Sequence, residues 1–291
     1  MFKKSHPLIC FLCIIRVSFA QAQPPSYEIA WKQEDTFDSL GMNNQGVVAA
    51  SIIHDNSYGY FTDIFLIYPN GSSVVLDGFS PPCSDNNHVR ISGINDNLQI
   101  AGSCDGHALY YTIENGAYLY STKVNQSTTF SINQAGQMSG NTYNDAVIFY
   151  NEEIISLGSF NDSTGITGQG RDINDRYGSD GLGQVVGDLP LNSAGSEPLS
   201  SQSFWFHDGM LKDISSVACG NENDSWAIAI NDHGKVLGLC NAFTSNEGLF
   251  IYETDTGEYQ YFDQNNVEPF TPSTGGLNNL GWVYVCYPSD S

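Results

Sequence analysis

A short pattern recurs six times along the 291-residue chain and constrains its fold more than any other feature. In each copy an apolar run ends at an asparagine, and a second apolar or β-branched run begins a few residues later. The copies follow one another at a mean spacing of roughly 47 residues, a period typical of propellers, solenoids and other repeat arrays. Their asparagines are Asn43, Asn95, Asn133, Asn174, Asn231 and Asn278.

Each copy predicts a tight hairpin turn. An asparagine side chain can bond to its own backbone, and a glycine three residues later can take positive φ. Asn231-Asp232-His233-Gly234 is one such turn, and the apolar residues on both sides of it are expected to form antiparallel strands.

A second hairpin follows most copies. Its strands are aromatic or β-branched, and pairs such as Asn70-Gly71 or Asp208-Gly209 form its turn. Two hairpins per repeat make a four-stranded meander, the unit of a propeller blade, so the sequence predicts an all-β fold, a β-propeller. The strands of the second hairpins are expected at 63–68 and 74–76, 108–113 and 118–120, 146–150 and 154–157, 203–206 and 210–214, and 249–252 and 259–262.

Closure of the ring requires strands from both ends of the chain. The last copy is followed by Trp282 to Cys286 and a short tail, so its outer strands are missing. The alternating segment Tyr27 to Trp31 lies before the first copy and can complete the last blade. We therefore expect six four-stranded blades, the last one closed by N- and C-terminal strands, in one domain over residues 23–291.

Residues 1–22 have the pattern of a secretory signal peptide. Lys3 and Lys4 precede an apolar stretch, Leu8 to Ile15, and Ala20-Gln21-Ala22 resembles a cleavage site. No other long apolar run follows, so we expect an exported protein, extracellular or periplasmic, without membrane insertion. The net charge of −22 becomes −25 without the three basic residues of this leader, which disfavours nucleic acid as a partner.

Two pairs of cysteines occupy equal positions in two of the copies, 12 residues before and 9 residues after the asparagine. In a meander both positions fall at the end of the blade opposite the asparagine turn, so we predict disulfides Cys83–Cys104 and Cys219–Cys240. A zinc site is the competing interpretation, although short paired spacings are missing. Cys286 is left as a buried free thiol or as an intermolecular partner.

The insertions of the chain are expected mostly on the face opposite the asparagine turns, at 53–60, 77–89, 189–202 and 217–226. Long loops on a rigid scaffold commonly carry binding, and their aromatic and polar side chains suit a sugar or a peptide. Packing between blades is the alternative role of each side chain. The candidate ligand-binding residues are His54, Asp55, Tyr58, His88, Asn223, Asp224 and Trp226.

Motifs for catalysis and cofactors are missing from the sequence. It has no Gly-x-Ser-x-Gly elbow, no His-Glu-x-x-His and no phosphate-binding glycine loop, so we expect no catalytic residue and no cofactor. The insertion from Asp172 to Gly183 contains oxygen ligands that calcium uses, yet it does not fit the calcium-loop pattern. An Asx-rich turn is the simpler interpretation, and structural calcium is the alternative.

The repeat resembles the HAF repeat family of bacterial extracellular proteins. The resemblance rests on Ile-Asn-Asp-x-Gly-Gln-Val-Val-Gly, on a degenerate His-Ala-Phe strand start such as Gly106-His107-Ala108-Leu109-Tyr110, and on an ending such as Ser156-Leu157-Gly158. It covers nearly the whole chain after the leader. The resemblance implies a bacterial exported propeller-like protein, and it implies no activity, because the family is defined by its repeat.

Two functions are compatible with these observations. The first is a secreted binding module that recognises a glycan or protein ligand through its loop-rich face. The alternative is a carbohydrate-active hydrolase or lyase, because the two carboxylates that such an enzyme needs have only to be close in space. The absence of catalytic motifs favours the binding module.

Overall fold

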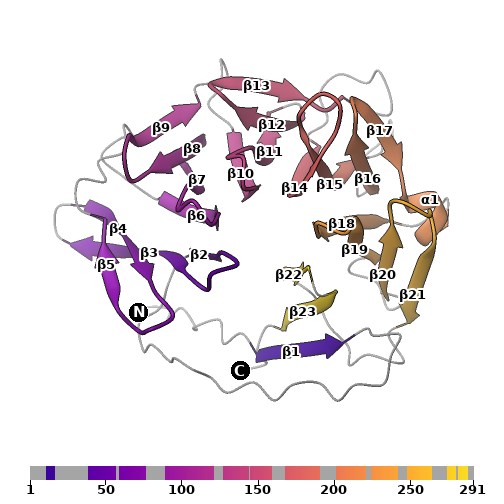
Figure 1. The fold of residues 1–291 in the computed structure, drawn as a ribbon, viewed down its shortest axis with the longest axis horizontal. Coiled ribbons are helices and arrows are strands. Elements are labelled where there is room, and N and C mark those ends of the chain that lie inside the picture. Colours follow the sequence, from indigo (N-terminus) through magenta and orange to yellow (C-terminus); the bar gives the residue numbers. More distant parts are fainter. Residues whose placement is uncertain are drawn as a thin grey trace, which may run out of the picture.

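The structure is a computed structural model that describes residues 11–16, 39–56, 59–76, 89–120, 127–143, 145–158, 168–190, 201–220, 224–241, 248–263, 274–279 and 281–287. Its strands form antiparallel sheets that lie around a common centre (Figure 1). Within these residues, five sheets have four strands and one has three. The all-β prediction is therefore confirmed.

Four-stranded meanders follow one another along the chain. The first two contain β2 (Ser39–Met42), β3 (Val48–Asn56), β4 (Gly59–Ile67) and β5 (Ser73–Val75), then β6 (Val89–Ile94), β7 (Ile100–Cys104), β8 (His107–Thr112) and β9 (Gly116–Tyr120). The third contains β10 (Ser127–Ile132), β11 (Met138–Thr142), β12 (Ala146–Tyr150) and β13 (Glu153–Ser156). The fourth and fifth contain β14 (Gln169–Tyr177), β15 (Gly183–Pro190), β16 (Ser201–His207) and β17 (Met210–Asp213), then β18 (Ser225–Ile230), β19 (Lys235–Cys240), β20 (Gly248–Glu253) and β21 (Tyr259–Asp263).

The sixth sheet joins the two ends of the chain. β22 (Thr274–Leu277) pairs with β23 (Trp282–Tyr287), and β23 pairs along its other edge with β1 (Phe11–Arg16). The strand that we expected there, Tyr27 to Trp31, lies outside the described residues. The N-terminal strand next to β23 therefore comes from a segment upstream of the expected one.

The first strand of each meander lies nearest the centre of the ring, and the last lies outside (Figure 1). We call the side of the ring with the asparagine turns the turn face, and the opposite side the loop face. The turns between the third and fourth strands also lie on the turn face, because the strands alternate in direction.

In five asparagine turns of the described residues, the asparagine side chain accepts hydrogen bonds from the turn backbone. Asn43 Oδ1 accepts hydrogen bonds from the N–H groups of Gln45 and Val47, at 3.1 and 2.8 Å. The same two bonds recur at Asn95, Asn133 and Asn231. One oxygen thus satisfies two backbone donors of the turn, in addition to the backbone bonds from Asn43 N–H to Val47 O and from Gly46 N–H to Asn43 O.

The same asparagines also connect neighbouring sheets. The Nδ2 atom of each one donates to the backbone oxygen of the next asparagine along the chain, at 2.8 to 3.1 Å, in five consecutive links from Asn43 to Asn278. The following residues form a parallel series, in which Gln134 N–H donates to Asp175 and Asp175 N–H donates to Asp232. We call this arrangement the asparagine ladder. The repeat thus specifies both a turn and the join between sheets.

Apolar side chains fill the seams between the sheets. Five buried clusters are described, and each contains residues of two consecutive sheets. Leu109, Phe149 and Phe250 are fully buried. Each such side chain stabilises the fold by about 1.5–3 kcal/mol relative to an exposed position.

The insertion at 53–60 is mostly not a loop. β3 and β4 form one long hairpin, in which Asp55 pairs with Tyr60 and Asn56 pairs with Gly59. The expectation of a loop here was wrong, because the strand pairing continues through these polar residues. The sequence also did not predict the short helix α1 (Ser215–Ala218), where Asp213 Oδ1 accepts a bond from Ser215 N–H at 2.8 Å. The described part contains no helix long and apolar enough to cross a membrane.

One predicted disulfide is confirmed. Cys219 and Cys240 are bonded, with their Cα atoms 5.4 Å apart, and they join the end of α1 to the end of β19 on the loop face. Cys104 is also disulfide-bonded, whereas its predicted partner Cys83 lies outside the described residues. Cys286 lies in β23 opposite Leu12.

Candidate functional site

The structure places the predicted site residues in two groups. His54 and Asp55 lie near the end of β3, opposite Phe61 and Tyr60. Asp224 directly precedes β18, and Trp226 is the second residue of that strand. The other candidates, Tyr58, His88 and Asn223, lie outside the described residues. The described candidates therefore lie in two separate sheets, His54 and Asp55 near the end of β3 and Asp224 and Trp226 at the start of β18.

Arg171 and Asp188 complete a cluster with this pair. Arg171 lies in β14 and its Nε atom donates to Asp188 Oδ1 in β15. The Arg171 guanidinium carbon lies 4.9 Å from the centroid of the Trp226 ring, in the next sheet. We call Arg171, Asp188, Asp224 and Trp226 the axial cluster, because Arg171, Asp224 and Trp226 lie at or next to the loop-face starts of β14 and β18, the first strands of their sheets, and Asp188 lies near the loop-face end of β15.

Burial raises the pKa of both carboxyls in this cluster. The side chain of Asp188 is 7% exposed and that of Arg171 is 24% exposed. Burial raises the pKa of the Asp188 carboxyl, the Arg171 guanidinium opposes that shift, and the Asp224 carboxylate adds to it. Burial also raises the pKa of Asp224, against a hydrogen bond of 2.5 Å from Ser201 N–H. Two interacting carboxylates with raised pKa values next to a cation are a common arrangement at functional sites.

Trp226 is also a packing residue. It packs against a buried cluster that contains Leu237, Leu239 and Leu249, while Arg171 lies over its ring. Ser225, one residue earlier, accepts a hydrogen bond of 2.9 Å from Ser203 N–H in the preceding sheet. The start of β18 thus ties two sheets together and places the Trp226 ring against the Arg171 guanidinium.

Sequence reasoning missed Arg171 and Asp188, although a signal was present. Arg171 is one of only ten basic residues, and it lies three residues before a repeat asparagine on the strand nearest the centre. Asp188 directly follows Gly187, the last residue of that repeat. The other internal repeats have an uncharged residue at the position of Arg171, namely Ser92, Phe130 and Ile228. The arginine therefore distinguishes this sheet from the others.

Asp172 is a second acidic group close to the centre. Its two oxygens accept hydrogen bonds from Ile173 N–H at 2.9 Å and from Ile230 N–H at 2.8 Å. Burial raises its pKa to about 6, and hydrogen bonds from the Ser131 side chain and from these backbone groups oppose the shift. Asp172 therefore links three consecutive sheets.

The insertion after Asn174 forms a small hairpin tip. Asn174 Oδ1 accepts from Gln184 N–H at 3.1 Å, so the repeat turn is completed across the insertion. Within it, Asp180 Oδ1 accepts from Leu182 N–H at 2.9 Å, as expected for an Asx turn. Among the described residues, no three His, Cys, Asp or Glu side chains are grouped in a way that could hold a metal ion.

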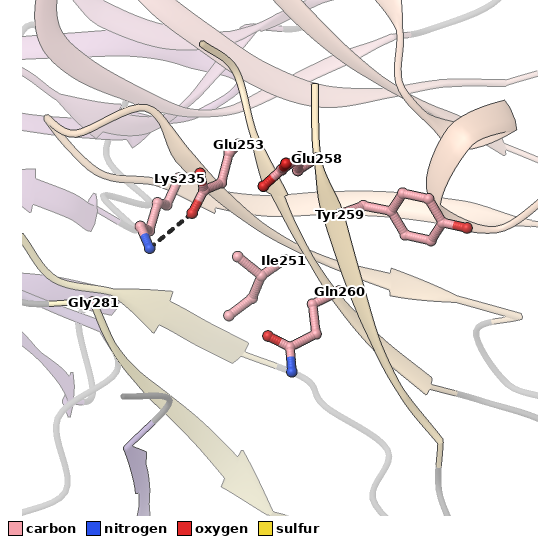
Figure 2. Close-up of a pocket in the computed structure, with 7 residues that line it drawn as sticks. All are labelled: Lys235, Ile251, Glu253, Glu258, Tyr259, Gln260 and Gly281. Atoms are coloured by element: carbon pink, nitrogen blue, oxygen red, sulfur yellow. Dashed lines mark ion pairs between the residues drawn. The ribbon is translucent and has the colours of Figure 1, made fainter. Parts of the chain in front are cut away.

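A pocket lies in the seam between the fifth and sixth sheets (Figure 2). Ile251 and Gln260 point into it, Lys235 and Glu253 form an ion pair of 3.0 Å at one side, and Tyr259 points away. Its volume of about 80 Å³ is well below the ~300–1,000 Å³ of typical small-molecule sites. The pocket is therefore a weaker candidate than the axial cluster.

Solved structures with similar folds are β-propellers. The β-propeller domain of the Trilobed protease from Pyrococcus furiosus matches with a TM-score of 0.55 and 12% identity, over 87% of this chain and 80% of that one. A putative TolB from Agrobacterium tumefaciens matches at 0.51 and 12%, over 91% and 94%. Virginiamycin B lyase from Staphylococcus aureus matches at 0.51 and 11%, over 86% and 76%.

No family model matches the sequence, and no curated protein matches it either. Identities near one tenth show a shared fold and carry no activity. The chain therefore has the fold of a β-propeller.

Proposed function

We propose that the protein is an exported six-bladed β-propeller that binds a glycan or protein ligand through its loop face. The observation that carries this proposal is the different use of polar side chains on the two faces. On the turn face, the repeat asparagines use their side-chain amides in hydrogen bonds to the neighbouring sheet. On the loop face, the axial cluster gathers two carboxylates and a guanidinium beside inserted segments.

The six sheets around one centre support the six blades of this proposal. β1 lies within the predicted leader, so export would remove it from the edge of β23. In the mature chain, Tyr27 to Trp31 would then pair with β23 and close the last blade. The Cys219–Cys240 disulfide supports an extracellular or periplasmic location, and the motif resemblance supports a HAF-type repeat.

A thermal-shift screen of the mature chain against oligosaccharides tests the proposed function, because a ligand that binds the native state raises the melting temperature. Asp224→Asn should weaken the shift given by any ligand found. Asp255→Asn is the matched control, because Asp255 is exposed on the turn face and pairs with Arg176 at 2.8 Å. Equal effects of the two variants would exclude the loop face as the site.

A carbohydrate-active hydrolase or lyase is the second candidate. The observation in its favour is that Asp224 lies close enough to Asp188 to raise the pKa of that carboxyl. Such coupling separates an acid from a base in many glycosidases. Incubation with polysaccharides should then release reducing or unsaturated ends, and Asp224→Asn should abolish this release while the protein stays folded. Lack of products from every polysaccharide class would remove this candidate.

A further inference from the structure

We infer that Arg171 binds a carboxylate of the ligand, and that the ligand of the loop face is an acidic sugar chain built from uronic acid units. This inference rests on the proposed function and names the chemical class of its ligand. It follows from the orientation of Arg171, from the distribution of basic residues and from the position of Asp224.

Arg171 is held in one orientation by two contacts. Its Nε atom donates to the buried Asp188, and its guanidinium lies over the Trp226 ring at 4.9 Å. Within the described part of the chain, no hydrogen bond or ion pair involves its terminal Nη1 and Nη2 atoms. A planar guanidinium that is anchored through Nε, with terminal nitrogens that bond to no described residue, matches the two oxygens of a carboxylate.

Arg171 is one of two described arginines near the loop-face ends of the first strands of the sheets, the other being the exposed Arg90 in β6. The arginine of the turn face, Arg176, already pairs with Asp255 at 2.8 Å. With only ten basic residues against 32 acidic ones, cations are few on any surface of this chain. Arg171 is itself paired with the Asp188 carboxylate, so a ligand carboxylate would be held by hydrogen bonds from its terminal nitrogens and not by a net positive charge of the cluster.

Asp224 restricts which anion fits. One of its oxygens accepts the bond from Ser201 N–H, and no described residue bonds to the other. A bare phosphate or sulfate would meet the repulsion of this carboxylate. A uronic acid carries a carboxylate and several hydroxyl donors on one ring, so it can bind to Arg171 and donate to Asp224 together.

Tetragalacturonate and its methyl ester are the probes for this inference, because they share a backbone and differ in carboxylate charge. Isothermal titration of the mature chain should show binding of the acid and at least roughly tenfold weaker binding of the ester, as expected for loss of charge-assisted hydrogen bonds. Arg171→Gln should weaken binding of the acid by roughly 10- to 100-fold. Arg176→Gln, on the turn face, should leave it unchanged.

Arg171→Gln leaves the buried Asp188 carboxylate without its partner and can destabilise the fold. The double variant Arg171→Gln, Asp188→Asn removes this unpaired charge, so the loss of binding can be measured on a folded protein. Circular dichroism and melting temperature check each variant. Equal binding of acid and ester, or full binding by the double variant, would overturn the inference. Binding of neutral oligosaccharides alone would overturn it and leave the proposed function intact, whereas no binding of any oligosaccharide would remove both the inference and the glycan form of the proposed function.

Discussion

The four internal sheets and the two terminal sheets use the same turn but differ in register. In the internal sheets the first strand contains a bulge three residues before the asparagine, at Ser92, Phe130, Arg171 and Ile228. In the terminal sheets the pairing continues without a shift, so Leu40 faces Ala50 and Gly275 faces Val285. An extra residue in one strand increases its bend and twist.

This difference explains the last glycine of the repeat. This glycine lies seven residues after the asparagine, or at the equivalent position where the turn has an insertion. A Cβ atom added there would clash with the backbone of the bulged strand. The four glycines are Gly102, Gly140, Gly187 and Gly238. At Gly187 the Cβ would lie 1.8 Å from the Gln169 carbonyl oxygen. The terminal sheets have Ala50 and Val285 at this position. The glycine is therefore required by the bulge and not by the turn.

The largest effect is expected at this glycine. Gly187→Ala should lower the free energy of unfolding by about 3 kcal/mol or more, because the clash is with backbone that cannot move aside. Ala50→Gly, at the equivalent position without a bulge, should cost only about 0.5–1 kcal/mol. Urea denaturation of both variants gives the comparison, and similar losses would show that the bulge is not the cause.

The asparagine ladder should not distinguish terminal from internal sheets. Asn133→Ala removes the bond to Asn174 O at 3.1 Å, a bond to Gln137 Oε1 at 2.9 Å and two turn bonds, and Asn43→Ala removes a ladder bond and two turn bonds. Each variant should lose about 2–3 kcal/mol, because buried donors and acceptors are left unsatisfied. Asn70→Ala, in an exposed turn outside the ladder, is the control and should lose under about 1 kcal/mol. A much smaller loss for Asn43 would indicate that the first sheet is loosely attached.

Asp172 makes one internal sheet sensitive to pH. Its pKa is about 6 in the folded protein, above its ordinary value of 3.8, so the folded state holds the proton more tightly. The stability that Asp172 contributes is complete below its unfolded pKa and is lost as the pH rises through about 6. The stability of the protein relative to Asp172→Asn should therefore fall by roughly 1–3 kcal/mol between about pH 4 and 7. Urea midpoints at several pH values measure this difference; a constant difference would contradict it.

The smallest effects are expected at the turn glycines. Gly281, in the terminal sheet, has φ of +77° and open space around the site of a Cβ, so Gly281→Ala should cost about 1 kcal/mol of strain. Gly234, in an internal sheet, has φ of +73°, and its Cβ would lie 2.3 Å from Thr254 Oγ1. Gly234→Ala should lose about 2 kcal/mol. Thermal melts of both variants show which one loses more stability. A larger loss for Gly281→Ala than for Gly234→Ala would contradict the crowding at the internal turn.

Local features of the fold could be predicted from the sequence. The strand predicted at 146–150 coincides with β12, and the strands predicted at 108–113 and 259–262 differ from β8 and β21 by one residue at their ends. The equal offsets of the cysteines led to the Cys219–Cys240 bond. These features repeat along the chain or lie within one hairpin, so the spacing of residues is sufficient to find them.

The candidate site could be predicted only in part. Asp224 and Trp226 were found because they end a segment that was expected to be a loop between two blades, although Trp226 belongs to β18. Arg171 and Asp188 were missed because they form a cluster only through their contacts with residues of the next sheet. The first strand of that sheet, β18, begins more than thirty residues after β15 ends. The position of β1 was missed for the same reason, since either of two N-terminal segments could pair with β23.

The sequence by itself determined the period, the turns, the all-β class and the pairing of two cysteines, because each depends on the conformational preferences of residues that are close along the chain. Only the tertiary structure decided which sheets carry a bulge, how the asparagines bond from sheet to sheet, and which charged side chains meet near the centre. These outcomes depend on distances across the seams between sheets. Burial there sets the pKa of Asp172 and Asp188 and holds Arg171 in place, and no local pattern contains that information.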